Sequence, residues 1–218
     1  MHTYSIDKDI REKVIIIIFV LSMIFSLVCT HFASAYIDEL KNKLLTSQVG
    51  IFVEFFEWLE VGPNFFGVPL WYAILSFIYN KWAWKWPMLR RFHNIPDLNG
   101  KWEGTLTSSY NGQTIPMEMF IEQTWNKISF KSVFPQTKSN SYSNVAAIYV
   151  DGNNGIEISF AFRNNSYSVQ NSMQSYIGYN ILNLVEENKI IAQYMNNREN
   201  PNHVFKGGNK GTFELERL

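Results

Sequence analysis

Apolar residues form two long runs in the first part of the chain, and shorter alternating runs follow them. The first long run, Val14 to Tyr36, has 23 residues and contains no Asp, Glu, Lys or Arg. As a helix it is about 35 Å long, which is enough to cross a bilayer. Its Ile-rich start favours a strand in water, but in lipid every backbone group needs a partner within the segment. We therefore predict a first transmembrane helix over residues 14–36.

A cleaved signal peptide is the alternative interpretation of this run. Residues 33–35 (Ala-Ser-Ala) resemble the small-residue cleavage site of such a peptide. The run is longer than a usual signal-peptide core, and Asp7, Asp9 and Glu12 precede it. We favour the membrane helix, and the signal peptide stays open.

The second long run, Val61 to Trp82, predicts a second transmembrane helix. Gly62-Pro63 at its start and Pro69 inside it predict an irregular or kinked helix. Its end, NKWAWKW, alternates Trp and Lys in the way typical of a membrane–water interface.

Basic residues predict the orientation of the two spans. Three precede the first span and four lie at or after the end of the second: Lys8, Arg11, Lys13, Lys81, Lys85, Arg90 and Arg91. The intervening residues 37–60 hold two basic residues against five acidic ones. The positive-inside rule then places both termini in the cytoplasm, residues 1–13 as a cytoplasmic tail and residues 37–60 as a short external loop.

The loop contains an aromatic and acidic stretch, GIFVEFFEWLEVG, that has two interpretations. As an interfacial helix it keeps Glu54, Glu57 and Glu60 in water. As an extension of the second span it places these carboxylates in the membrane, where they pair helices or line a polar defect. Both interpretations stay open.

A linker over residues 83–98 leads to a strand-rich segment, residues 99–218. Asn-, Gly- and Ser-rich breaks such as DGNNG and KGGNKG separate its alternating runs. The runs predict eight strands: 101–109, 114–123, 126–134, 141–150, 155–163, 176–185, 189–196 and 210–218. We therefore predict a membrane-anchored all-β fold, in which two N-terminal helices precede an eight-stranded antiparallel up-and-down barrel of lipocalin-like type.

Two local features favour closure of this barrel. Gly100 and Trp102 give a Gly-x-Trp pattern on the first strand, and Arg217 lies on the last one. In lipocalin-like barrels such a Trp fills the base of the core, and an Arg from the final strand stacks on it. A buried Trp in a β-sandwich is the alternative interpretation.

An eight-stranded barrel is either filled by side chains or holds one small ligand. Four ring-bearing or amide residues, Tyr142, Tyr176, Asn180 and Tyr194, favour a ligand with rings and hydrogen-bonding edges. Each of these tyrosines can equally be a half-buried strand residue.

Composition argues against an enzyme and against a nucleic-acid duplex as partner. The formal net charge is zero, the chain has one cysteine, Cys29, and its four histidines lack ligand-like spacing. The sequence shows no nucleophile elbow, P-loop or dinucleotide fingerprint. We predict neither a metal site nor a cofactor.

The order of these parts and the segment IPDLNGKWEGTL resemble a known family. These are the two-transmembrane β-barrel effectors of the bacterial cyclic-oligonucleotide-based anti-phage signalling system (CBASS). The resemblance implies a barrel in the cytoplasm that binds a cyclic dinucleotide from a cognate nucleotidyltransferase. Binding then promotes oligomerisation in the inner membrane and disrupts the bilayer, so that the infected cell dies or stops growing.

For such a ligand we expect bases to stack on tyrosines, an Asn to bind base edges, and an Arg near the rim to bind phosphate. Strict alternation points Arg163 out of the barrel, beside an inward Phe162. The candidate ligand-binding residues are Tyr142, Arg163, Tyr176, Asn180, Tyr194 and Arg198.

Two other functions stay open. A membrane-tethered carrier of an apolar ligand has a pocket of Met, Ile and Phe with no phosphate partner. An adaptor barrel is filled by its own side chains and acts through its outer surface.

Overall fold

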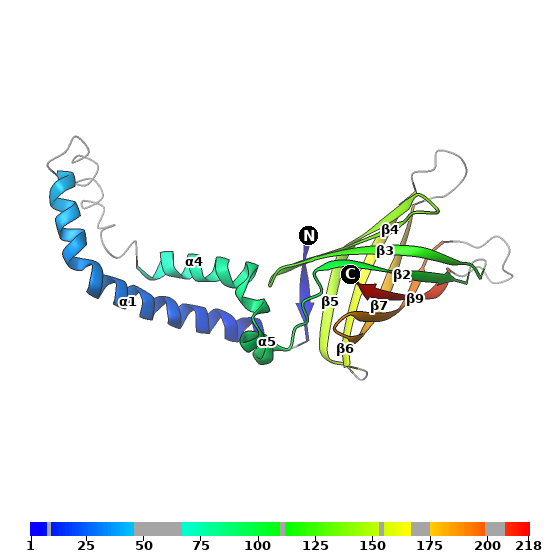
Figure 1. The fold of residues 1–218 in the computed structure, drawn as a ribbon, viewed down its shortest axis with the longest axis horizontal. Coiled ribbons are helices and arrows are strands. Elements are labelled where there is room, and N and C mark those ends of the chain that lie inside the picture. Colours follow the sequence, from blue (N-terminus) through cyan, green and yellow to red (C-terminus); the bar gives the residue numbers. More distant parts are fainter. Residues whose placement is uncertain (8–9, 46–66, 110–111, 153–154, 167–174, 199–207) are drawn as a thin grey trace. The chain divides into compact units, whose positions relative to one another are not determined.

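The computed structural model describes residues 1–7, 10–45, 67–109, 112–152, 155–166, 175–198 and 208–218, without the side chains of residues 30 and 32–45. The chain forms two compact units (Figure 1). One contains residues 9–83 and is helical. The other contains residues 84–218 together with the first eight residues of the chain.

The helical unit contains α1 (Ile10–Leu45) and α4 (Val68–Lys81), which pack against each other. The Phe25 and Trp71 rings lie 5.2 Å apart, and Phe19 meets Tyr72 edge to face. Ser22 is fully buried and donates a 2.6 Å hydrogen bond to the carbonyl of Ile18. A small polar residue that returns its hydroxyl to its own helix lets a second helix approach closely.

Within α1, the segment Ile10–Cys29 is long and apolar enough to cross a membrane, and most of its side chains are exposed. The helix continues beyond the predicted residue 36 to Leu45. Exposure of Ile, Leu and Phe along several turns is unfavourable in water, so this surface needs an apolar environment.

The described part of the second predicted span is α4, with 14 residues. Pro69 lies in the first turn of α4, where a missing N–H costs nothing, so it does not interrupt this helix. Gly62-Pro63, the other source of the predicted irregularity, lies outside the described residues. Residues 46–66, with Glu54, Glu57 and Glu60, lie outside the described residues. Among the described residues only α1 contains a candidate span, and the two-span arrangement stays a prediction.

Two short helices, η1 (Ala83–Lys85) and α5 (Pro87–His93), follow α4 along the chain. Pro87 starts α5, and Asn94, with a left-handed φ of 55°, ends it. Pro at the first helical position and Asn just past the last one are the residues that helix ends favour.

All eight predicted strands are present, and the sheet closes into a barrel (Figure 1). They are β2 (Gly100–Ser108), β3 (Thr114–Gln123), β4 (Lys127–Phe134), β5 (Ser139–Gly152), β6 (Gly155–Ser166), β7 (Tyr176–Glu186), β8 (Lys189–Asn196) and β9 (Lys210–Arg217). Each pairs antiparallel with its neighbour in sequence, and β9 pairs with β2.

The ring has nine strands, because β1 (His2–Ile6) joins it from the segment predicted as a tail. β4 and β5 pair with each other only near their connecting turn, at residues 131–134 and 139–142. Farther from the turn β1 lies between them, antiparallel to β4 at two positions and parallel to β5 at three. The predicted β-barrel behind an N-terminal apolar helix is confirmed, and the described residues add one strand, β1, to the eight that were predicted.

Side chains hold β1 in this position. Tyr4 is buried and donates a hydrogen bond to the carbonyl of Thr124. The His2 ring and the Ser143 hydroxyl are 2.7 Å apart, and Asp7 accepts hydrogen bonds from the backbone N–H groups of residues 150 and 151. These contacts involve neighbouring strands on both sides of the gap.

One end of the barrel is filled by apolar side chains. Phe130 and Phe160 stack with ring centroids 4.2 Å apart and an interplanar angle of 6°. Other buried members of this core include Trp102, Met119, Ile128, Ile148, Ile158, Leu182, Phe213 and Leu215. These residues follow the period-two alternation of the strands.

Trp102 and Arg217 pair across β2 and β9 at the filled end. The Arg217 guanidinium lies 5.6 Å from the centre of the Trp102 ring and donates to the carbonyls of Asp97 and Asn99. Gly100 has a φ of +134°, and a Cβ there would lie 3.3 Å from Arg217 Nε. Glycine adopts this backbone conformation easily, and its lack of a Cβ leaves room for the Arg217 side chain.

We expect the Tyr4→Ala substitution to destabilise the barrel by about 3 kcal/mol, because it removes a buried ring at the seam that β1 closes. Chemical denaturation of the full chain in detergent, followed by tryptophan fluorescence, measures the change. Ser5→Ala, at an exposed position of the same strand, is the control and leaves the midpoint unchanged. Equal midpoints for the two variants would show that β1 adds nothing to stability.

A buried histidine lies below the filled end of the barrel. His93 Nδ1 accepts from the N–H of Ile95 at 3.0 Å, so Nε2 carries the proton and donates to the Trp84 carbonyl at 2.9 Å. The Trp125 ring lies 5.0 Å from the imidazole. Burial lowers the pKa of His93 and the charge of Arg90 adds to this, against the opposing effect of the Trp84 carbonyl.

Because the folded chain takes up a proton at His93 less readily than the unfolded chain, we expect stability to fall as pH drops below 6.5, the ordinary pKa of histidine. Thermal unfolding of the full chain at about pH 7.5 and about pH 5 measures this fall. The His93→Gln variant keeps an amide donor for the Trp84 carbonyl and has a smaller fall over the same range. An identical fall in both proteins would rule out His93 as the source.

Candidate ligand-binding site

The other end of the barrel is hollow. A cavity of about 290 Å³ opens there, one residue layer beyond the stacked Phe130 and Phe160. Ser132 and Phe162, the next inward residues on the same two strands, line it. Inward side chains are therefore large and apolar at the filled end (the base) and smaller and more polar at the hollow end (the mouth). This difference leaves space for a ligand.

The cavity lining is rich in hydroxyl and amide groups. Four residues of the β4–β5 end contribute hydroxyls, and four asparagines come from β6, β7, β8 and the position before β9: Ser132, Thr137, Ser139, Ser141, Asn164, Asn180, Asn196 and Asn209. Arg198 adds a cation, and the described lining residues include no Asp or Glu. Such a lining suits a ligand that is negatively charged and carries many hydrogen-bonding edges.

Hydrogen bonds fix the backbone of Arg198 at the cavity. Its N–H donates to Asn196 Oδ1 at 3.1 Å, and its carbonyl accepts from Asn209 Nδ2 at 3.0 Å. Asn209 is buried. An arginine whose main chain is held on both sides presents its guanidinium with less loss of entropy on binding.

Tyr176 and Tyr194 both line the cavity and stay protonated at neutral pH. Burial raises the pKa of Tyr176, against the lowering effect of Arg198. Burial also raises the pKa of Tyr194, against a hydrogen bond with Ser108 and the charge of Arg198. Each phenol can therefore donate a hydrogen bond, and each ring offers an apolar face.

Two glycines make room for the aromatic rings of the cavity. A Cβ on Gly178 would lie 2.4 Å from the Phe162 ring, and a Cβ on Gly211 would lie 2.6 Å from the Tyr194 ring. Both glycines are strand residues opposite these aromatics in the register. Their hydrogen side chains allow Phe162 and Tyr194 to lie flat against the neighbouring strand.

The cavity brings four of the six candidate ligand residues together: Tyr176, Asn180, Tyr194 and Arg198. Tyr142 and Arg163 lie outside it, paired with each other across β5 and β6 on the outer face of the wall. Their neighbours Ser141, Phe162 and Asn164 are inward, so alternation places both outside. The cavity gives no support to these two residues as ligand contacts.

Sequence reasoning missed most of the polar lining. Ser132 and Asn164 occupy inward positions on strands whose other inward residues are apolar, and Ser141 lies between Ser139 and Ser143, which are also buried. The sequence signal for such a residue is a Ser or Asn at an inward position of a strand whose other inward positions are apolar. Asn196 ends β8, two positions after the inward Tyr194, whereas Asn209 precedes β9 and lies outside the strand alternation.

Comparison with known proteins identifies the class of this fold and cavity. A family model described as "Cap15, cyclic dinucleotide receptor domain" matches residues 93–217, which is more than half of the chain. The chain therefore belongs to the Cap15 family of cyclic dinucleotide receptor domains. The predicted membership among CBASS effectors is confirmed.

Two curated relatives bear the name "CD-NTase-associated protein 15". The one from Yersinia aleksiciae is 27% identical over 171 residues, which is 78% of this chain and 76% of the relative. The one from Escherichia albertii is 29% identical over 93 residues, 42% of this chain and 47% of the relative. A solved structure described as "Structure of EF1p2_mFAP2b bound to DFHBI" aligns with 56% of this chain and 94% of its own, at a TM-score of 0.36 and 11% identity.

Proposed function

We propose that this chain is a non-enzymatic, membrane-anchored CBASS effector whose barrel binds a cyclic dinucleotide in the hollow end. The observation that carries the proposal is the cavity itself. Within a family of cyclic dinucleotide receptor domains, this barrel has a lining of amides, hydroxyls, two tyrosines and one arginine. The polar lining argues against a carrier of apolar ligands, and the hollow argues against a barrel filled by its own side chains.

The residues of the cavity have separate roles in this proposal. Arg198 binds a phosphate, Tyr176 and Tyr194 stack on or donate to a base, and Asn180 reads a base edge. A cavity of about 290 Å³ is at the small end of ligand sites, so it encloses one nucleotide and leaves the other at the mouth.

The barrel is joined to the helical unit at two points of the chain. β1 ends at Ile6 and α1 begins at Ile10, while α4 ends at Lys81 and α5 begins at Pro87. Short connections transmit a change in the barrel wall better than long flexible ones. We propose that ligand binding favours an oligomer, that the exposed apolar helices gather in the inner membrane, and that the bilayer is disrupted.

The cognate nucleotidyltransferase makes the messenger inside the cell, so the proposed function requires a cytoplasmic barrel. In this proposal the chain crosses the inner membrane twice, with both termini in the cytoplasm. The basic residues around the two apolar runs support this orientation.

We expect Arg198→Gln to weaken binding of a cyclic dinucleotide roughly 10- to 100-fold, because a charge-assisted hydrogen bond is lost. Titration calorimetry on the full chain in detergent measures the affinity, with a panel of cyclic dinucleotides. Arg163→Gln removes the same charge from the outer wall and leaves the affinity unchanged. Equal losses in both variants would mean that the cavity is not where the ligand binds.

We expect a C-terminal green fluorescent protein fusion to fluoresce and a C-terminal alkaline phosphatase fusion to be inactive. In both fusions the reporter lies in the cytoplasm together with the barrel. The two fusions are compared in cells at equal expression. A fusion of each reporter after residue 60 gives the opposite pattern if the loop is external. An active phosphatase at the C-terminus would exclude an intracellular messenger as ligand.

A further inference from the structure

The outer face of the α5 segment is apolar although it lies outside the predicted membrane spans. Trp86, Met88 and Phe92 have exposed fractions of 58%, 82% and 53%. Trp84 of η1 and His93 of α5 are buried, and the rings of both lie against Trp125 of the barrel. The segment is therefore fixed to the barrel by one face and offers large apolar side chains on the other.

A basic groove lies beside these side chains. Arg90, Arg91 and Asn94 line it together with apolar Pro87, Val150 and Ile156, and its volume is about 470 Å³. Arg90 forms a 2.6 Å ion pair with Glu187, whose side chain is 81% exposed. An ion pair with so exposed a carboxylate is weak, so Arg90 can exchange it for a phosphate at little cost.

Charge and chain continuity indicate what covers this face. Residues 61–96 contain no Asp or Glu, and their four basic residues all lie after residue 80. This segment follows directly on α4, whose Leu70, Ile74 and Phe77 are exposed. Apolar side chains interleaved with Arg and Lys are the composition of surfaces that lie at an anionic bilayer.

We propose that α5 and its groove form a docking surface for the anionic phospholipid headgroups of the bilayer. Arg90 and Arg91 bind headgroup phosphates, while Trp86, Met88 and Phe92 insert at the boundary of the acyl chains. This inference rests on the membrane anchoring in the proposed function and adds a second attachment, through the barrel unit itself. The bilayer thereby becomes a direct partner of the sensor domain.

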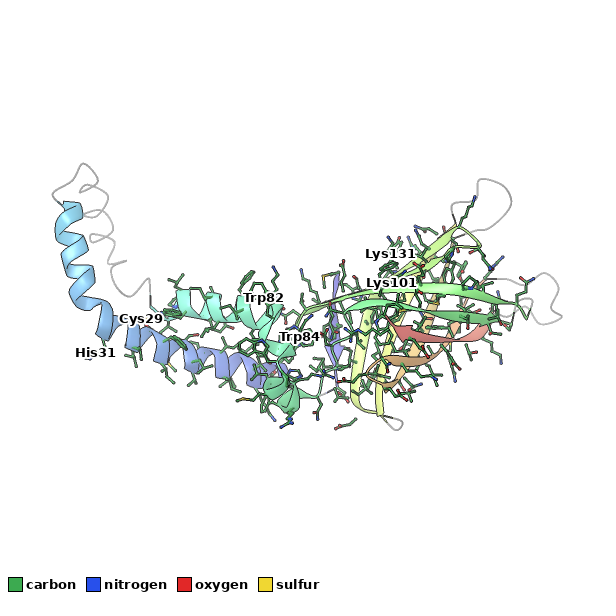
Figure 2. All side chains as sticks on the ribbon, viewed as in Figure 1. Cys29, His31, Trp82, Trp84, Lys101 and Lys131 are labelled. Atoms are coloured by element: carbon green, nitrogen blue, oxygen red, sulfur yellow. The ribbon has the colours of Figure 1, made fainter. Side chains whose placement is uncertain are left out.

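The test uses the full chain with Cys29→Ala and one new cysteine that carries an environment-sensitive fluorophore. Phe92→Cys reports on the docking surface, and Lys131→Cys, on the exposed side of β4 (Figure 2), is the matched control. Both are placed in nanodiscs of phosphatidylcholine, with or without phosphatidylglycerol. We expect a blue-shifted emission at position 92 only, and a larger shift when phosphatidylglycerol is present.

Arg90→Gln combined with Arg91→Gln is expected to abolish the response to phosphatidylglycerol, whereas Arg163→Gln leaves it intact. Water-like emission at position 92 in both lipid mixtures would overturn the docking surface. Binding of a cyclic dinucleotide to the same samples separates this failure from failure of the proposed function. Intact nucleotide binding together with water-like emission at position 92 refutes only the docking surface. Loss of the chain from the membrane fraction refutes both the docking surface and the proposed function.

Discussion

The barrel depends on the backbone hydrogen bonds that close the gap between β4 and β5. These strands pair near their turn and then separate, which leaves two edges with unpaired N–H and C=O groups. β1 fills the gap by pairing with both edges, antiparallel on one side and parallel on the other. The residues that precede α1 are therefore part of the barrel wall. The closed wall includes both β1, before α1, and β9, the last strand of the chain.

The same gap lies next to the ligand cavity. Ser143 Oγ contacts the His2 ring and also accepts a 3.0 Å hydrogen bond from the N–H of Phe130. The next inward residue of β5 toward the mouth is Ser141, which lines the cavity. A ligand that contacts the β4–β5 end therefore acts on the strands between which β1 is held. β1 leads within a few residues into α1, which contains the apolar segment Ile10–Cys29.

Alternation and turn residues were sufficient to predict the eight antiparallel strands, because each pairs with a neighbour in sequence and buries one face. They could not predict β1, whose five residues pair with partners more than 120 positions away and whose pattern, HTYSI, has one buried residue. In the cavity, Tyr176, Asn180 and Tyr194 were found from their residue types. Tyr142, chosen for the same reason, lies on the outer face, because alternation points it away from the side of its inward neighbour Ser141. Of the asparagines beside Arg198, Asn196 ends β8 and follows the inward Tyr194 by two positions, whereas Asn209 lies outside the strands, where the sequence holds no periodic signal.

Two features of the barrel interior follow from one taper in side-chain size. At the base, rings such as Phe130, Phe160 and Trp102 fill the space and Arg217 covers the end, so this half is rigid. At the open end, serines and asparagines leave the space open, and Gly178 and Gly211 allow Phe162 and Tyr194 to lie against the wall. The interior therefore has one packed end and one open end. Among the described strands, β1 has the fewest paired residues, two with β4 and three with β5.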